Sequence, residues 1–214
     1  MEIIEETKKF LLLKTQMGQT FENYYPWRKH QKSIYLHSLR VHHNALRLMK
    51  SETVNEEEQN IIEMAALTHD LGKLEKGENH GIRSREIVCE WLKENPIIQK
   101  QIDCNRLLDI IASHSIKEEN DNDICSQILK DADLLDELGA LSIIMQVYKT
   151  NNEDPLYYYQ ILNNLKTKEM EYCLKAKRLI QTKSGLEYLN QKLDFIKNFI
   201  LELEEELYGE GNSN

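Results

Sequence analysis

Proline and glycine are scarce in this sequence. It has 3 prolines and 8 glycines among 214 residues, whereas Leu, Ile, Glu, Lys and Gln are abundant. A protein with many strands needs many turns, and proline and glycine form a large share of them. Their scarcity excludes most all-β architectures, and the abundant residues are good helix formers. We therefore predict an all-α chain.

Three further absences bear on where the protein works. The cysteines form no Cys-x-x-Cys pair, which excludes zinc-ribbon and thiol-redox motifs and leaves reduced structural thiols at Cys89, Cys104, Cys125 and Cys173. No apolar run approaches the roughly 18 residues of a membrane span. Residues 1–10 are acidic and amphipathic, unlike a secretory signal. We expect a cytoplasmic protein without membrane association.

Positive charge is in deficit as well. The chain has 27 Lys and Arg against 36 Asp and Glu, which gives a formal net charge of −9. Proteins that bind polyanions carry a basic surface, so we do not expect nucleic acid as a partner. With 41% hydrophobic residues, the chain is long enough for one domain with a substantial core.

Residues 33–50 are predicted to form a helix that carries a histidine on its apolar stripe. Three- and four-residue steps place these side chains on one face: Ile34, His37, Val41, Ala45 and Leu48. His37 thus occupies a core position, as a hydrogen-bonded core group or as a ligand. His42 and His43 fall off the stripe, and we expect them to be solvated.

A His-Asp pair ends the next apolar helix. Asn55 and Glu58 are typical of a capping box that opens this helix. His69 and Asp70 lie about 100° apart around the helix axis, so both can turn toward one point beside the last turn. We expect Gly72 to close the helix in a left-handed conformation. An imidazole next to a carboxylate suits a divalent transition-metal ion.

Further histidines and carboxylates follow along the chain. His80 precedes a predicted helix, and His114 ends the apolar stripe of another. Several carboxylates interrupt the apolar helix predicted at residues 124–138, where their burial is costly without a cation or hydrogen-bond donors. Helical periodicity puts Asp131 nearer the apolar face than Asp133, so either is a candidate ligand on this basis.

Together these residues resemble the HD superfamily of metal-dependent phosphohydrolases. Three pieces match, in the family's order and spacing: His37-Ser38-Leu39-Arg40-Val41, Leu67-Thr68-His69-Asp70-Leu71-Gly72-Lys73 and Asp131-Ala132-Asp133-Leu134-Leu135-Asp136. The resemblance covers roughly residues 30 to 145. It implies an all-helical HD domain, and it favours Asp133 over Asp131. The set that it implies for one divalent ion is His37, His69, Asp70 and Asp133.

The resemblance also implies a second ion and a reaction. His80 and His114 match positions that hold a second metal in a subset of the family that includes some nucleotide hydrolases. One or two divalent ions (Mn, Fe, Co, Ni, Zn or Mg) are therefore expected, with a metal-activated water that attacks phosphorus. We expect His69, Asp70 and Lys73 to be catalytic, and Lys73 and Arg83 are candidates to bind phosphate. Asp136 and Glu137 are candidates to hold a ligating imidazole by its other nitrogen.

The hypothesis that these residues favour is a phosphohydrolase acting on a nucleotide or a similar small phosphate ester. The alternatives are a nucleoside triphosphate pyrophosphohydrolase, a phosphodiesterase, a non-catalytic nucleotide-sensing module and a helical scaffold with satisfied core histidines. Pattern alone does not choose the substrate, because specificity depends on pocket shape.

We expect the chain to be divided into four parts. These are an N-terminal helix with an aromatic loop (1–29), the HD core (30–145), C-terminal helices that pack on the core (146–208) and a disordered tail (209–214). Residues 141–148 are apolar and predict a core helix. The amphipathic C-terminal helices are also suited to pairing with a second copy, so a homodimer stays open.

Overall fold

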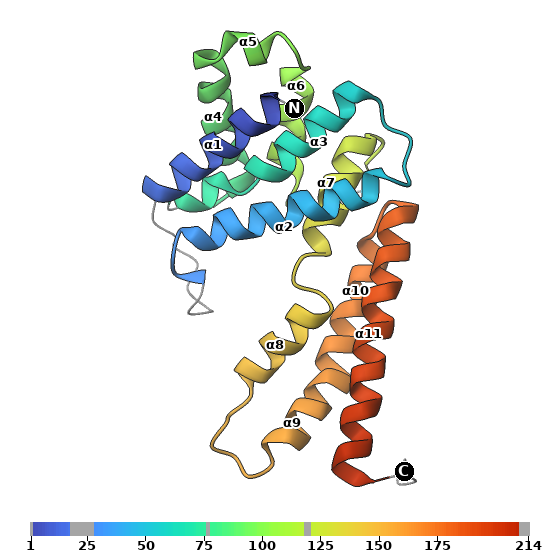
Figure 1. Ribbon diagram of the computed structural model, residues 1–214. Coiled ribbons are helices and arrows are strands. Elements are labelled where there is room, and N and C mark those ends of the chain that lie inside the picture. The colour runs from blue at the N-terminus through green and yellow to red at the C-terminus, as the bar shows by residue number, and fades with distance from the viewer. Residues whose placement is uncertain (1, 18–27, 76–77, 118–120, 210–214) are drawn as a thin grey trace.

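The computed structural model describes residues 2–17, 28–75, 78–117 and 121–209. These residues form helices joined by short loops and contain no strand, which confirms the all-α prediction (Figure 1). The helices are α1 (Glu2–Met17), α2 (Lys32–Met49), α3 (Glu56–Thr68), the 3-10 helix η2 (Leu71–Leu74), α4 (His80–Glu94), α5 (Pro96–Gln99), α6 (Cys104–Ser113), α7 (Ile124–Leu134), α8 (Ala140–Lys149), α9 (Tyr157–Asn164), the π-helix η3 (Leu165–Glu169), α10 (Met170–Leu179) and α11 (Lys183–Tyr208).

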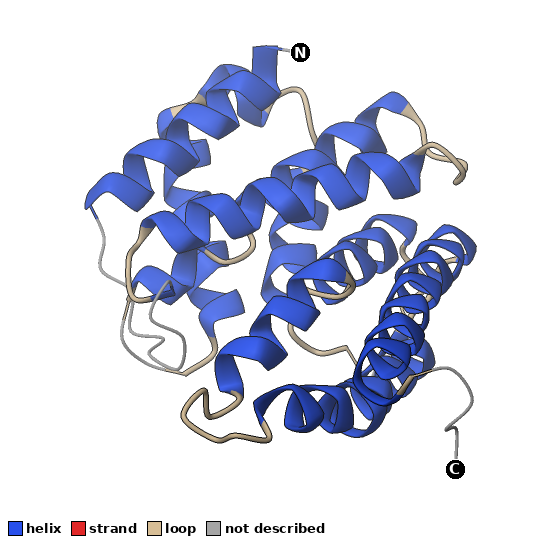
Figure 2. Cartoon of the chain, turned by 60° about the horizontal axis from the view of Figure 1, so that its bottom comes forward, coloured by secondary structure: helices blue, strands red, loops and turns tan. Residues whose placement is uncertain are grey.

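The helices fall into two groups, which we call the core bundle (α1–α7) and the C-terminal lobe (α8–α11). In the core bundle, α3 packs against α1, α2, α6 and α7, and α4 packs against α6. In the C-terminal lobe, α11 lies along α8, α9 and α10, and its first turns reach α2 and α7 (Figures 1 and 2). The predicted division at residue 145 falls inside α8.

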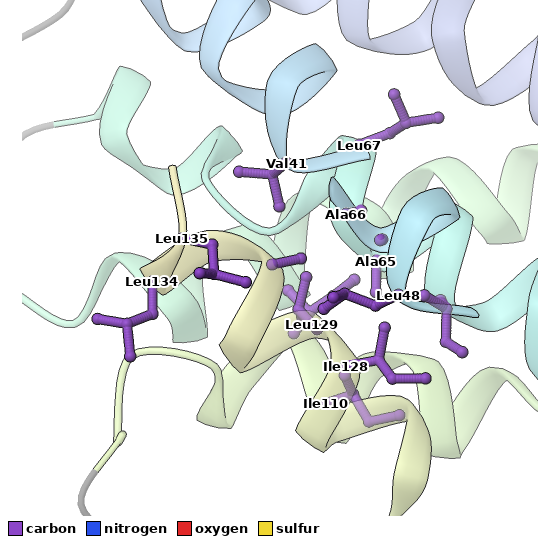
Figure 3. Packing of buried hydrophobic residues seen from close by; sticks show 14 of the residues in the cluster. Val41, Leu48, Ala65, Ala66, Leu67, Ile110, Ile128, Leu129, Leu134 and Leu135 are labelled. Atoms are coloured by element: carbon purple, nitrogen blue, oxygen red, sulfur yellow. The ribbon is translucent and has the colours of Figure 1, made fainter. Parts of the chain in front are cut away.

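The core of the bundle forms around α3 because this helix is apolar on almost every side. Its residues from Met64 to Thr68 are all buried, as expected of a helix surrounded by others. Val41 of α2, Ile110 of α6 and Leu129 of α7 pack around it (Figure 3). The capping box is present at its start, which fixes where this central helix begins.

Two predictions about burial are wrong. His42 is only 3% exposed, and its Nε2 lies 2.7 Å from Glu63 Oε2. The reason is that α2 contacts α1 as well as α3 and α7, so more than one of its faces is buried. The helix α8 was expected in the core, but Leu141 is 40% and Ile144 60% exposed. Only one side of α8 packs on α11 and η3.

Some predictions concern residues outside the described part of the chain. The aromatic segment 21–27 and all of the predicted tail except Gly209 belong there. Within the described residues, no helix has both the length and the apolar character needed to cross a membrane.

A buried carboxylate joins the C-terminal lobe to α7. Asp131 is fully buried and accepts hydrogen bonds from Gln181 N (2.9 Å), Thr182 N (2.8 Å) and Thr182 Oγ1 (2.7 Å). Burial raises the pKa of Asp131, although these bonds oppose the shift. A Cβ on Gly185 would lie 2.4 Å from Asp131 Oδ2, so glycine is needed for this close approach. Asp131 therefore anchors the start of α11.

Asp131→Ala is expected to lower the free energy of unfolding by about 3 kcal/mol, because it leaves the N–H groups of half-buried Gln181 and buried Thr182 without an acceptor. Urea unfolding followed by circular dichroism measures this change. Asp109→Ala is the matched control, since Asp109 is exposed and its surface ion pair with Arg85 contributes little. Equal stability of the two variants would contradict the anchoring role.

Candidate metal centre

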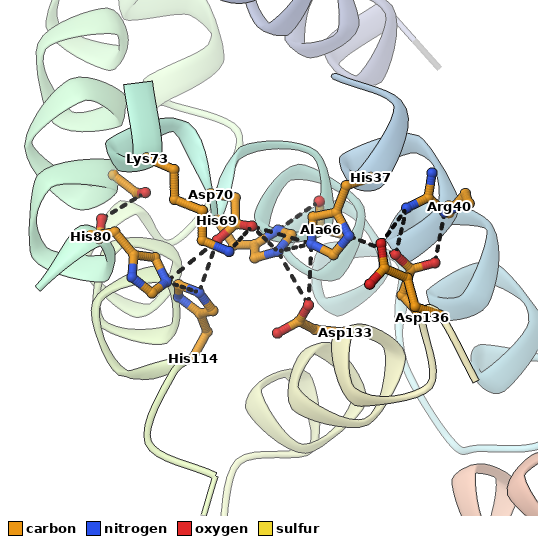
Figure 4. Close-up of polar contacts among 12 residues, drawn as sticks. His37, Arg40, Ala66, His69, Asp70, Lys73, His80, His114, Asp133 and Asp136 are labelled. Carbon is orange, nitrogen blue, oxygen red and sulfur yellow. Dashed lines mark hydrogen bonds and ion pairs between the residues drawn. The ribbon is translucent and has the colours of Figure 1, made fainter. Parts of the chain in front are cut away.

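The six residues predicted as metal ligands lie together at the centre of the core bundle (Figure 4). Five segments supply them, and each residue lies in or directly after a helix. His37 comes from α2, His69 and Asp70 follow α3, His80 begins α4, His114 follows α6 and Asp133 lies near the end of α7.

Asp70 lies between two groups of imidazoles. Its Oδ2 is 3.2 Å from His37 Nε2 and 3.6 Å from His69 Nε2. Its Oδ1 is 3.4 Å from both His80 Nε2 and His114 Nε2, and these two nitrogens are 3.2 Å apart. The two carboxylate oxygens therefore face two different groups of ring nitrogens.

Asp133 completes the group around His37. Its Oδ1 lies 3.2 Å from His37 Nε2 and 3.7 Å from His69 Nε2. Its Oδ2 is held by Lys117 Nζ at 2.6 Å. Asp131, the alternative from helical periodicity, points instead toward the start of α11. Two carboxylates on one helix thus have different roles, because the helix is buried on more than one side.

Helix ends orient two of the rings. His69 Nδ1 donates to the carbonyl of Ala66 at 3.0 Å, and His114 Nδ1 donates to the carbonyl of Ile111 at 2.7 Å. A carbonyl oxygen only accepts, so Nδ1 carries the proton and Nε2 presents a lone pair. These lone pairs point toward the carboxylate oxygens at the centre.

This arrangement fits a divalent cation. The Nε2 lone pairs of His69 and His114 face the oxygens of Asp70 at 3.6 Å and 3.4 Å. Within the described residues, Asp70 Oδ1 is buried and accepts no hydrogen bond. Electron pairs that face one another in a buried site are costly unless a cation lies between them. Imidazole and carboxylate are also the ligands that divalent transition-metal ions prefer.

Burial and charge set the protonation of these groups. Burial lowers the pKa of His69, and it lowers the pKa of His80 to about 4. Both rings are therefore neutral near pH 7, the form that binds a metal. Burial raises the pKa of Asp133, but the attraction of Lys117 and the hydrogen bonds to His37 and His69 together outweigh it and hold the pKa well below its usual value. The carboxylate is thus ionised.

His37 is surrounded by carboxylates. Burial lowers the pKa of its imidazole, but hydrogen bonds to Asp133, Asp136 and Asp70 outweigh burial and raise this pKa well above its usual value. Three carboxylates around one ring demand positive charge at this point. Either a proton on His37 or a metal ion at its Nε2 would offset the negative charge of these carboxylates.

Asp136 holds the other side of the His37 ring. Its Oδ2 accepts from His37 Nδ1 at 2.7 Å, and the same carboxylate accepts two hydrogen bonds of 2.8 Å from Arg40. Such an outer carboxylate fixes the orientation and tautomer of a ligating imidazole. Glu137, the other candidate for this role, pairs instead with Arg28 and Arg40.

Among the candidate phosphate-binding residues, Lys73 and Arg83 differ in their contacts. Lys73 Nζ lies 2.7 Å from Asp70 Oδ2 and faces the centre. The guanidinium of Arg83 donates to the backbone carbonyls of Gly72, Glu75 and Glu78, so it fastens the loop before α4.

Lys117, which pairs with Asp133, was not predicted. Lys117 lies about one turn beyond His114, which could have indicated that it is near the centre. The polar residues that follow it are instead typical of a solvated loop.

The expected role of Gly72 is wrong. Its φ is not in the left-handed region, and it lies inside η2 rather than at a helix end. A Cβ at this position would be 2.1 Å from the carbonyl oxygen of His80 and 2.7 Å from the backbone nitrogen of Ser84. Glycine is required because η2 packs directly on the first turn of α4. This contact brings His80 to the centre.

A cavity of about 280 Å³ opens beside the centre, between α2, η2 and α8. His37, Asp70 and Lys73 line its inner end, and Leu141 and Ile144 of α8 line the opposite wall. A small molecule in this cavity would therefore reach the cluster of imidazoles and carboxylates.

Residues 34–138 match the family model of the HD domain. This match contains all six clustered residues, and the matched segment is an HD domain, a domain of the HD superfamily, whose members are mostly metal-dependent phosphohydrolases. A search of curated protein sequences found no match.

Solved structures share the fold over nearly the whole chain. YpgQ of Bacillus subtilis in complex with ADP is 19% identical, with a TM-score of 0.62 and coverage of 97% of this chain and 96% of that one. A Listeria innocua protein is 19% identical, with a TM-score of 0.59 and 96% coverage of each chain. A Lactobacillus plantarum protein is 18% identical, with a TM-score of 0.58 and coverage of 96% and 97%.

Glu137 at the edge of the cavity has a left-handed backbone, with φ of 60°. A residue with a Cβ is disfavoured there, so Glu137→Gly should be more stable than Glu137→Ala by about 1 kcal/mol. Both variants lose the same side chain, and urea unfolding compares them. The same pair at Glu202, exposed within α11, should show the opposite order. A more stable alanine variant at residue 137 would contradict backbone strain.

Proposed function

We propose that this chain is a divalent-metal-dependent phosphohydrolase that acts on a nucleotide or a similar small phosphate ester. The observation that carries the proposal is the position of Asp70, whose two oxygens face separate groups of imidazoles beside an open cavity. A buried carboxylate of this kind is suited to bridging two ions. The family of the matched HD domain supports the reaction class.

The proposed ion positions share Asp70. The first would be held by His37, His69, Asp70 and Asp133, and the second by Asp70, His80 and His114. When bound, divalent ions lower the pKa of water and neutralise charge on phosphoryl oxygens.

The chain's own groups orient the reactants. Asp136 fixes the His37 ring, and Lys117 holds one oxygen of Asp133 so that the other faces the centre. In hydrolysis, a water oxygen bonds to phosphorus, the bond to the leaving oxygen breaks and that oxygen takes up a proton. Lys73 lies at the mouth of the centre, where its ammonium group can bind a phosphate oxygen and offset the charge that develops there.

A nucleotide substrate is supported by two observations. The cavity, at about 280 Å³, is close to the lower end of the range of small-molecule pockets, which is on the order of 300–1,000 Å³. In addition, YpgQ, which shares the fold, has been crystallised with ADP. The compartment is proposed to be the cytoplasm, in keeping with the sequence.

Metal analysis of untagged protein tests the ligand set. We expect up to two ions per chain in the wild type, about one in His80→Ala and near zero in Asp70→Ala, because Asp70 serves both positions. His43→Ala is the matched control, since His43 is exposed, and it should bind as the wild type does. Circular dichroism verifies that each variant is folded. Unchanged metal content in Asp70→Ala would overturn the assignment.

A screen of nucleotides and phosphate esters with Mn²⁺ or Mg²⁺ tests the reaction. Release of phosphate supports the proposed phosphohydrolase, whereas release of pyrophosphate from a triphosphate supports the pyrophosphohydrolase. Lys73→Ala should lower kcat by about 100-fold, because one donor to a developing charge is lost. Lys93→Ala, an exposed lysine on α4, should leave kcat unchanged. Binding without turnover under any metal would favour the sensing module.

A further inference from the structure

The cavity beside the metal centre has two ends of different character. Its inner end contains His37, Asp70 and Lys73, which belong to the proposed ion and phosphate site. Its outer part lies between α2 and α8, the helix that Figure 1 shows below the N-terminal half of α2. A ligand that fills the cavity would therefore place one end at the metal centre and the other against α8.

The charges of the outer part are balanced. Arg28 is paired with Glu137, and Arg40 is paired with Asp136 through two hydrogen bonds. Glu137 lines the cavity, and Asp136 lies outside the lining but neutralises Arg40, so each arginine of this wall has a paired carboxylate. With ions bound as proposed, phosphate groups are favoured at the inner end, beside Lys73, and a neutral group is favoured in the outer part.

Apart from Ser33, the remaining residues that line the cavity are apolar. Leu36 of α2 and Leu141, Ile144 and Met145 of α8 line the cavity. Leu36 is 44% exposed, and Leu141 and Ile144 are likewise open to solvent. Among the residues that the structure describes, α8 packs on α11, α9 and η3 with its other side, and Leu141 and Ile144 stay exposed. Apolar surface that lines a cavity next to convergent polar groups is typical of a small-molecule site.

We propose that this outer part of the cavity binds the base and sugar of a mononucleotide, with Leu141 and Ile144 of α8 as specificity-determining residues. This inference rests on the proposed function, because it takes the phosphates to lie at the metal centre. The flat faces of a base match the apolar walls, and the balanced polar wall offers hydrogen-bond partners to the sugar. At about 280 Å³, the cavity is near the lower end of the size range of small-molecule sites, which suits a single mononucleotide.

Binding of two matched ligands by the metal-loaded protein tests the inference. One ligand is α,β-methylene-ADP, and the other is methylenediphosphonate, which has the same P–C–P bridge and no nucleoside. Calorimetry should show tighter binding of the nucleotide analogue by the wild type. Leu141→Ala/Ile144→Ala should weaken that binding by about tenfold and change methylenediphosphonate binding by less than about twofold, since only apolar contacts to the nucleoside are lost.

The control is Leu174→Ala/Leu201→Ala, which removes two exposed leucines of α10 and α11 outside the cavity and should bind both ligands as the wild type does. All four residues are exposed, so the variants are expected to fold, and circular dichroism verifies this. Equal wild-type affinity for the two ligands, or unchanged nucleotide binding in the α8 variant, would overturn the inference. If the protein binds the nucleotide analogue selectively but hydrolyses no nucleotide or phosphate ester in the screen, the proposed function is contradicted and the inference about the nucleoside site still holds.

Discussion

The burial of the Asp70 carboxylate is the constraint on which the rest of this structure depends. An ionised group in a core is tolerated only when positive charge or donors surround it. Here Lys73 contacts one oxygen, and the other neighbours are ring nitrogens that would share a cation with the carboxylate. Each ring comes from a different helix, so the helices must meet at one point. The core bundle can therefore be understood as the packing that brings these rings to one carboxylate.

The imidazole rings of the centre are oriented by helix ends rather than by long loops. His69 and His114 each donate to a carbonyl three residues earlier, at the end of their own helix, so the backbone itself aims the ring. Gly72 lets η2 lie directly on α4, which places His80. A centre supported in this way depends on backbone geometry that few side-chain substitutions at the surface can disturb.

The fold class was predictable from composition and helical periodicity, whereas the grouping of the six residues was predictable from the family resemblance, because the motifs that carry it keep their order. Features set by contacts between distant segments were not. Periodicity finds one buried face, so it missed the burial of His42 on a helix with several neighbours, and it left the choice between Asp131 and Asp133 to the family resemblance. The exposure of α8 and the pairing of Lys117 with Asp133 likewise depend on which helix lies opposite, information that a single segment does not contain.

The two aspartates of α7 have a consequence for substrate length. Asp133 faces the metal centre, and Asp131, two residues earlier, fixes the first turn of α11, on which α8 packs. After α7, a turn of five residues with left-handed backbone at Glu137 leads into α8. The spacing between the proposed metal centre and the apolar wall is thus set by the last turn of α7 and by the five residues that follow it. A ligand must therefore match this fixed separation if it is to contact both the centre and the apolar residues of α8.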